Sequence, residues 1–107
     1  MKALYLVATA ASICISASAF AVDGESLFSK SGCASCHSPA KSGIGPSLKD
    51  ISAKYAGDKK AQAMLEKKVR SGGSGSFPKM PMPMPATPSS VSDADIKSMV
   101  AWILGLK

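Results

Sequence analysis

Two cysteines and the single histidine of the chain lie together in the segment Cys33-Ala34-Ser35-Cys36-His37. In a helical turn, positions i, i+3 and i+4 share one face, so both thiols and the imidazole point the same way. Two thiols at this spacing can bond to the two vinyl groups on one edge of a haem, and the adjacent imidazole can then bind the iron. C-x-x-C-H is the attachment pattern of covalently bound haem. The sequence therefore predicts one haem c, attached through Cys33 and Cys36 and ligated by His37.

Three other uses of a C-x-x-C pair fit the chain less well. A structural zinc site needs about four protein ligands, and beyond the N-terminal segment the chain offers only Cys33, Cys36 and His37. A thioredoxin-like redox pair belongs to an α/β domain, and no stretch here alternates as a strand does. A plain disulfide suits an exported protein but leaves His37 without a role.

The N-terminal segment has the features of a cleaved secretory signal peptide. Lys2 supplies a positive charge, residues 3–15 form a short apolar run, and Ala19-Phe20-Ala21 is a small-x-small cleavage site. A membrane anchor is the alternative, but the run is short and lacks a stop-transfer flank. Lipidation of Cys14 is another, but the preceding residues match a lipobox poorly. We predict a signal peptide at residues 1–21, a mature domain at residues 22–107 and a location in the periplasm.

The mature region is small, basic and poor in large apolar side chains. A domain of this size buries a low fraction of its surface, and a haem would supply an apolar centre. The formal net charge of the whole chain is +6, and its dispersed lysines fit either a solvated surface or a docking face. The chain has a single arginine and no aromatic residues interleaved with its basic ones, so nucleic acid is not an expected partner.

Helix signals divide the mature region into about four short helices and no strands. We expect helices from Asp23 to about Ser31, from Ser47 to about Ala56, from Asp58 to about Arg70 and from Ser92 to about Leu106. The first residue of each range is the expected N-cap. Five prolines between residues 78 and 88 exclude a helix or central strand there. The predicted fold class is all-α, with helices joined by Gly- and Pro-rich loops.

A methionine thioether is the best candidate for the second axial ligand, because the chain has no other histidine. Met80, Met82 and Met84 alternate with prolines in a rigid, extended segment. Only one of the three can bind the iron, and the other two would line the pocket or face solvent. Met64 and Met99 instead fall on the apolar stripes of helices, and we expect them to fill the core.

His37 also needs a partner for the ring nitrogen that does not bind iron. A metal-bound imidazole donates its other N–H to a neighbouring acceptor, which fixes the ring and tunes its basicity. The Gly45-Pro46 step follows the haem turn closely, and proline holds its backbone rigid. We expect the carbonyl of Pro46 to be the acceptor; the alternative is a simple loop proline.

The mature region resembles the small bacterial class I cytochromes c, in particular the c-551 type. The similarity rests on Leu27-Phe28 before the Gly32–His37 segment, on Gly45-Pro46, on a Gly/Ser stretch leading to Pro81-Met82-Pro83, and on Val91-Ser92-Asp93 opening a last helix with Trp102. It implies the cytochrome c fold, with a few helices wrapped around one haem whose edge stays exposed. The activity that it implies is the transfer of single electrons between larger periplasmic partners.

The resemblance places the axial thioether at Met82 when the loop is counted forward from Gly72. Counting backward from Val91 favours Met84 instead, because this loop is longer than is usual in the family. Met82 is therefore the predicted ligand and Met84 the alternate.

Phe77 is a departure from the family pattern. These cytochromes often have a tryptophan there that donates a hydrogen bond to a haem propionate, and phenylalanine has no donor. We therefore expect Lys68 or Arg70, near the end of the third helix, to stabilise the propionates.

These features predict a monohaem electron carrier and not an enzyme. A thioether ligand and an apolar pocket both favour the ferrous state. The expected partners are periplasmic redox proteins or membrane-bound oxidoreductases, with no small-molecule substrate and a monomeric state. Two alternatives stay open: a haem enzyme or gas sensor with a displaceable sixth ligand, and a copper-handling protein that uses Met80, Met82 and Met84 as soft ligands.

Overall fold

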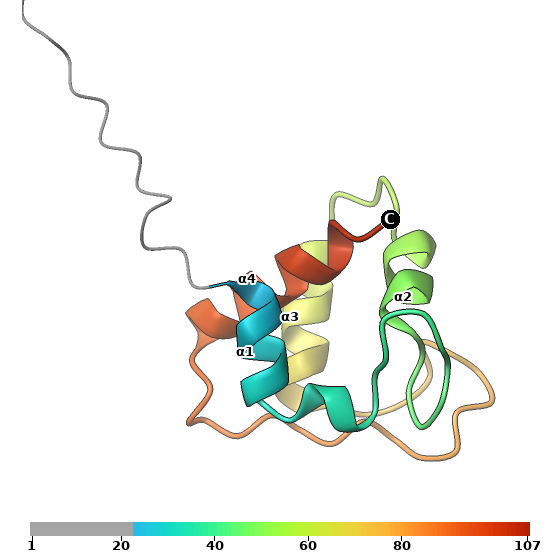
Figure 1. Ribbon diagram of the computed structural model, residues 1–107, viewed down its shortest axis with the longest axis horizontal. Coiled ribbons are helices and arrows are strands. Elements are labelled where there is room, and N and C mark those ends of the chain that lie inside the picture. Colours follow the sequence, from blue (N-terminus) through green and yellow to red (C-terminus); the bar gives the residue numbers. More distant parts are fainter. Residues whose placement is uncertain (1–22) are drawn as a thin grey trace, which may run out of the picture.

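The computed structural model describes residues 23–107, so the predicted signal peptide at residues 1–21, including Cys14, lies outside the described residues. The chain forms α1 (Gly24–Lys30), the 3₁₀ turn η2 (Cys33–Ser35), α2 (Leu48–Lys54), α3 (Ala61–Ser71) and α4 (Asp93–Leu104) (Figure 1). This part of the chain holds no strand, only an isolated antiparallel bridge between Gly73 and Met84. No helix within residues 23–107 has the length and apolar character needed to span a bilayer. The predicted all-α class is confirmed.

Polar side chains begin α1, α2 and α4, as the sequence predicts. Asp23, Ser47 and Ser92 each accept a hydrogen bond from a backbone N–H two or three residues further along the chain. These bonds satisfy donors of the first turn that have no partner inside the helix. α2 and α4 each end about two residues earlier than predicted, at Lys54 and Leu104.

The start of α3 differs from its prediction. Asp58 does not cap the helix, because its carboxylate accepts a hydrogen bond from the N–H of Lys60 at 2.9 Å and closes a turn before the helix. α3 begins at Ala61. Short polar side chains close such turns as readily as they cap helices. The residue type alone therefore does not distinguish an N-cap from a turn residue.

The prediction that Met64 fills the core is wrong. Met64 is 41% exposed, whereas Ala61 is fully buried, and Leu65 and Val69 pack against the core. The inner face of α3 therefore runs through positions 61, 65 and 69, and Met64 lies outside it. Met99, the other predicted core methionine, is 2% exposed as expected.

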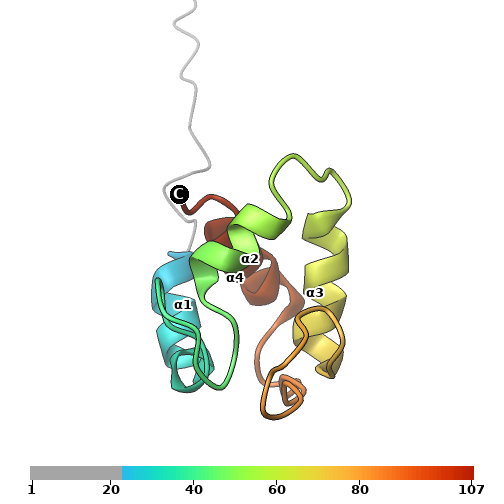
Figure 2. The ribbon, with the colours of Figure 1, turned by 90° about the vertical axis from the view of Figure 1, so that its right-hand side faces the viewer.

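The core lies where α1, α2 and α3 meet α4. Phe28 from α1 and Leu48 from α2 pack with four buried residues of α4, which are Ile96, Met99, Val100 and Ile103. Figure 2 shows α4 behind α2, with α1 on one side of it and α3 on the other. The last helix is thus the element on which the other three are assembled.

α1 and α4 are in close contact at Gly24. A Cβ at this position would lie 2.5 Å from the Cβ of Trp102 and 2.6 Å from the carbonyl oxygen of Ser98. Next to this contact, the rings of Phe28 and Trp102 form a tilted aromatic pair, with centroids 5.5 Å apart. The first helix is fixed to the last in this way, and the cysteine turn that follows α1 is held in place.

Candidate functional site

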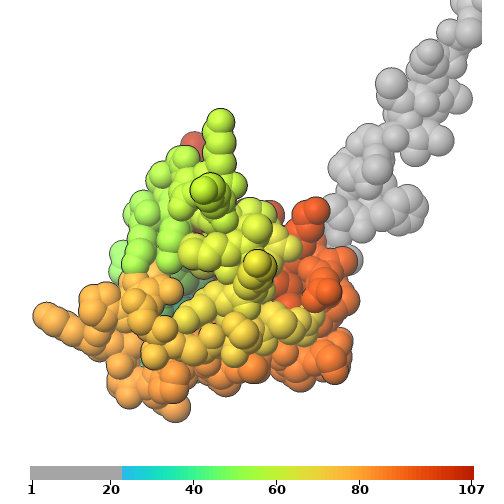
Figure 3. Space-filling model, turned by 180° about the vertical axis from the view of Figure 1, so that it is seen from behind, coloured from blue at the N-terminus to red at the C-terminus, as the bar shows by residue number. Residues whose placement is uncertain are grey.

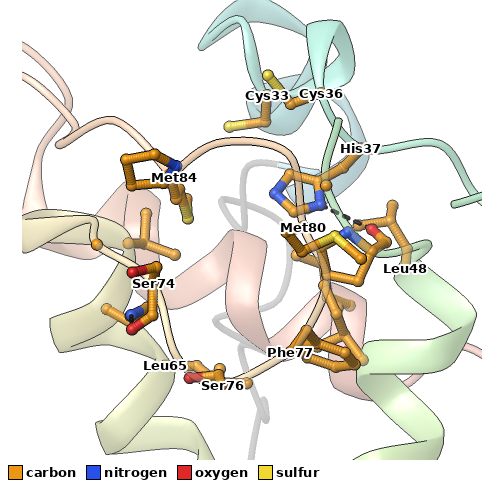
Figure 4. A pocket seen from close by; sticks show the side chains of 18 of the residues that line it. Cys33, Cys36, His37, Leu48, Leu65, Ser74, Ser76, Phe77, Met80 and Met84 are labelled. Atoms are coloured by element: carbon orange, nitrogen blue, oxygen red, sulfur yellow. Dashed lines mark hydrogen bonds between the residues drawn. The ribbon is translucent and has the colours of Figure 1, made fainter. Parts of the chain in front are cut away.

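A cavity lined mostly by apolar side chains brings together the residues that the sequence predicts to attach the haem, to ligate its iron or to orient His37. Its wall includes Cys33, Cys36, His37, Pro46, Met80, Met82 and Met84. Figure 4 shows the cysteine turn at one end of the cavity and the segment with the methionines along its side. We call residues 73–84 the methionine loop; Figure 3 shows it, in light orange, along the lower edge of the molecule below α2.

The turn η2 positions the two cysteines. The N–H groups of Cys36 and His37 both donate to the carbonyl oxygen of Cys33, at 3.2 and 3.0 Å. Gly32 enters the turn with φ of 79°, a conformation that glycine adopts without steric cost. Both thiols are half-buried and free. The turn therefore presents two unpaired thiols and an imidazole within one tight loop.

The thiol of Cys33 is held in its neutral form. Partial burial raises the pKa of Cys33, a backbone hydrogen bond opposes the rise, and the nearby Cys36 adds to it. The neutral thiol is less reactive toward oxidants than the thiolate. Burial therefore favours the neutral thiol of Cys33 over its thiolate.

His37 is fixed by the loop that precedes α2. Its Nδ1 lies 2.8 Å from the carbonyl oxygen of Pro46, so the ring donates its N–H there. Gly45 brings this loop against the imidazole: its N–H donates to the carbonyl of Cys36 at 2.9 Å, and a Cβ would lie 2.7 Å from Cε1 of His37. In Figure 4 the other ring nitrogen faces the cavity, which leaves Nε2 free to bind a metal there.

The two ends of the methionine loop meet beside the end of α3. The N–H of Gly73 donates to the carbonyl of Met84 at 2.8 Å, and the N–H of Met84 donates back at 2.9 Å. The neighbouring Gly72 has φ of 69°, and a Cβ there would lie 2.4 Å from the carbonyl oxygen of Met84. Only glycine at position 72 allows the two ends of the loop to approach this closely.

The three methionines of this loop differ in their exposure. Met80 and Met84 are half-buried, and Figure 4 shows their side chains pointing into the cavity. Met82 also lines the cavity but is 56% exposed. All three sulfur atoms are thus carried by the loop along the cavity, with Met82 nearest to solvent.

The two cations predicted to stabilise the propionates lie in different places. Lys68 lines the cavity, and its Nζ donates to the carbonyl of Ser74 at 3.2 Å. Arg70 lies outside the cavity wall: it donates to three backbone carbonyls of the segment before α4 and pairs with Asp93, the first residue of α4, at 2.7 Å. Arg70 is therefore a structural residue, and the expectation that it serves the propionates is wrong.

The residues of the cavity fit a covalently held haem. Two thiols and an imidazole with a fixed Nδ1 lie at one end, thioethers lie along the side, and the wall between them is mostly apolar. Histidine and methionine together are one of the known ligand pairs of haem iron. Among residues 23–107, no three His, Cys, Asp or Glu side chains are arranged to hold a metal ion.

This fold and donor set define a small class I c-type cytochrome. The chain belongs to the cytochrome c family, whose sequence profile matches residues 21–107. It is 50% identical over 80 residues to cytochrome c-551 of Allochromatium vinosum, which covers 75% of this chain and 82% of the relative. It is 40% identical to cytochrome c-552 of Nitrosomonas europaea over the full length of both chains. The crystal structure of that cytochrome superposes with a TM-score of 0.70 and 42% identity, covering 78% of this chain and 99% of the other.

Membership of this family confirms the predicted fold, cofactor and class of activity. The protein carries one covalently bound haem c, and the C-x-x-C-H segment provides the matching pair of cysteines. It is an electron carrier and not an enzyme.

The sequence did not predict the role of one lysine near the cavity. Lys54, at the end of α2, donates to the carbonyl of Ser76 in the methionine loop. Its sequence neighbourhood does not distinguish it from the other dispersed lysines, because the partner is a backbone carbonyl far along the chain.

Proposed function

We propose that the protein, after removal of residues 1–21, passes single electrons between redox proteins of the periplasm or membrane-bound oxidoreductases. In this proposal Cys33 and Cys36 attach the haem by thioether bonds, and His37 and Met82 are its axial ligands. The bound haem supplies a one-electron ferrous–ferric couple. His37 and Met82 would hold the iron from the polypeptide, so that little would have to move during electron transfer, and the apolar wall would keep water from the haem.

The observation that carries the proposal is the hydrogen bond between Nδ1 of His37 and the carbonyl of Pro46, at 2.8 Å. Because Nδ1 carries the proton, the lone pair of the neutral ring is on Nε2. That nitrogen faces the cavity (Figure 4). The imidazole is therefore oriented for metal binding by the chain itself.

Met82 is proposed as the second ligand because Pro81-Met82-Pro83 continues from Gly72 as the family pattern does. Its exposed side chain has room to turn inward, whereas the backbone of Met84 is held by its bridge to Gly73. Met84 stays the alternate, since its side chain already points into the cavity.

The rim of the cavity suits brief contact with a redox partner. Ile44, which is 45% exposed, and Met82 present apolar surface beside the half-buried thiols. Lys2 leaves with residues 1–21, so the formal net charge falls from +6 to +5. Acidic partners would be attracted over a distance that salt shortens. We expect rates of electron transfer to an acidic partner to fall as ionic strength rises.

The experiment is purification of the protein from the periplasmic fraction of its native host, with intact mass and visible spectra. The expected mass is that of residues 22–107 plus one haem, and haem stain should stay with the band on a denaturing gel. The reduced protein should bind no carbon monoxide under native conditions. A colourless protein, a retained N-terminus or a lipidated Cys14 would contradict the proposal.

Two outcomes would favour the alternatives. Rapid carbon monoxide binding to the reduced protein would indicate an open sixth position, as in a haem enzyme or gas sensor. Copper in place of haem would indicate that Met80, Met82 and Met84 act as soft copper ligands.

A further inference from the structure

Lys54 is held between two aromatic rings beside the cavity. Its Nζ lies 4.4 Å from the ring centroid of Phe77 and 5.7 Å from that of Tyr55. The same ammonium donates a hydrogen bond to the carbonyl of Ser76. A lysine at the end of α2 thus contacts two consecutive residues of the methionine loop, one through its backbone and one through its ring.

This contact is the one that holds the tip of the loop. The ends of the loop are tied on the α3 side, by the bridge between Gly73 and Met84 and by the hydrogen bond from Lys68 to Ser74. Within residues 23–107, the bond from Lys54 to Ser76 is the only hydrogen bond that joins residues 75–83 to other parts of the chain. Figure 4 shows Ser76 and Phe77 at the end of the cavity away from the two cysteines.

The backbone of the tip gives a reason why such an anchor is needed. Gly75 has φ of 107°, and Lys79 has φ of 68°, which is unfavourable for a residue with a Cβ. The prolines that follow limit the segment further but supply no donors. The tip therefore has little of its own to hold it in one conformation, and contacts from α2 decide where it lies.

We propose that Lys54 is a positioning residue: it pins the tip of the methionine loop against α2 and so keeps the candidate ligands Met82 and Met84 along the wall of the cavity. Phe77 takes part as the ring on which the ammonium rests. The link to ligation depends on the proposed function, whereas the pinning of the loop does not. Removing the ammonium should leave the helices intact and raise the population of conformations in which the loop has moved away.

Three variants separate this role from a general effect of charge. Lys54→Met removes the ammonium and keeps an unbranched chain, and Lys54→Arg keeps a cation that stacks on aromatic rings and donates hydrogen bonds. Lys49→Met is the matched control, because Lys49 is an exposed lysine of the same helix whose side chain makes no hydrogen bond in the structure. All three are made in the full holoprotein.

The first measurement is the rate of cleavage of the Lys79–Met80 bond by a lysine-specific protease under native conditions, followed by mass spectrometry. An exposed cation–π contact corresponds to about a two- to five-fold change in an opening equilibrium. We expect Lys54→Met to speed this cleavage by about that factor, with Lys54→Arg and Lys49→Met close to the parent protein. Equal rates in Lys54→Met and Lys49→Met would overturn the proposal, whether or not haem is bound.

The second measurement is the rate at which cyanide displaces the sixth ligand of the ferric protein, together with the sulfur-to-iron charge-transfer absorption. Lys54→Met should bind cyanide about two- to five-fold faster and show a weaker absorption band, and Lys54→Arg should restore both. If the parent protein lacks this band, the proposed function fails. If the band is present and cyanide entry does not respond to Lys54→Met, only the role of Lys54 fails.

Discussion

The hydroxyl of Ser52, in the middle of α2, lies 2.7 Å from the carbonyl oxygen of Leu106 and 3.1 Å from that of Leu104. The last carbonyls of a helix have no partners within it, so a buried side chain of α2 satisfies the end of α4. Ser52 is only 7% exposed. This bond joins the helix that follows the Pro46 loop to the helix that carries most of the core.

Replacing Ser52 with Ala should lower the free energy of unfolding by about 1–3 kcal/mol, because two part-buried carbonyls lose their donor. Chemical denaturation of the holoprotein measures this. Ser98→Ala is the control, since the hydroxyl of Ser98 donates to the carbonyl of Ala94 in its own helix, and it should change stability by less than about 0.5 kcal/mol. Equal effects of the two substitutions would show that the link between α2 and α4 contributes little.

Gly24→Ala should be destabilising even though alanine favours helices over glycine by about 1 kcal/mol. The added Cβ would lie 2.5 Å from the Cβ of Trp102, so α1 must move away from α4, at a cost of about 1–3 kcal/mol. Gly43→Ala is the matched control, because no atom lies within 4 Å of a Cβ built there. A thermal unfolding temperature for Gly24→Ala equal to or above that of the parent would contradict this packing.

Gly45→Ala should raise the reduction potential. The new Cβ would lie 2.9 Å from Nδ1 of His37, so the ring must shift from the Pro46 carbonyl, and a weaker hydrogen bond makes the imidazole a poorer donor to ferric iron. The free energy of one hydrogen bond, converted for a one-electron couple, corresponds to a shift in reduction potential of roughly 20–60 mV. Spectroelectrochemical titration measures the shift, and an unchanged potential relative to Gly43→Ala would show that the hydrogen bond does not tune the iron.

Met82→Ala should abolish the sulfur-to-iron charge-transfer absorption and lower the reduction potential, by an amount on the order of 100 mV, because axial ligands set haem potentials. Met80→Ala should leave both unchanged, although Met80 points into the cavity. Visible absorption of the ferric protein distinguishes the variants. Loss of the band in Met84→Ala and its retention in Met82→Ala would assign the ligand to Met84.

Arg70→Met and Asp93→Asn should differ in their effects on stability. Arg70 donates to the carbonyls of Thr87, Pro88 and Val91, so its loss should cost about 1–2 kcal/mol. The side chain of Asp93 is 95% exposed, and exposed ion pairs contribute little to stability. Asp93→Asn should therefore change the free energy of unfolding by less than about 0.5 kcal/mol, and equally large losses would mean that the ion pair matters more than the carbonyls.

Local signals predicted the helical frame because they act over a few residues. Ser47 and Ser92 cap their helices as expected, since a hydroxyl reaches only the N–H groups of the next turn. Asp58 failed as a cap because its carboxylate makes the same kind of local bond in a turn before the helix. Met64 failed because the inner face of α3 is chosen by its contact with α4, which no local pattern encodes.

The candidate site was predictable where its residues are adjacent in sequence and unpredictable where they are not. Cys33, Cys36 and His37 share one turn, so their type and spacing indicate their chemistry directly. The contact of Lys54 with Ser76 joins residues that are distant in sequence, through a carbonyl that every residue possesses. Arg70 was misjudged for the same reason, because its acceptors are backbone atoms of the segment before α4.

Because the bridge between Gly73 and Met84 closes the base of the methionine loop, the loop can change in length without moving the helices. Inserted or deleted residues between these two positions change the length of the methionine loop and leave its two ends in place. Doubling the length of a flexible loop costs only about 0.6 kcal/mol, so the helical scaffold tolerates such changes. A change in the length of the methionine loop would therefore alter which methionine sulfur faces the iron position. The reduction potential would change with it, while the hydrophobic core stays the same.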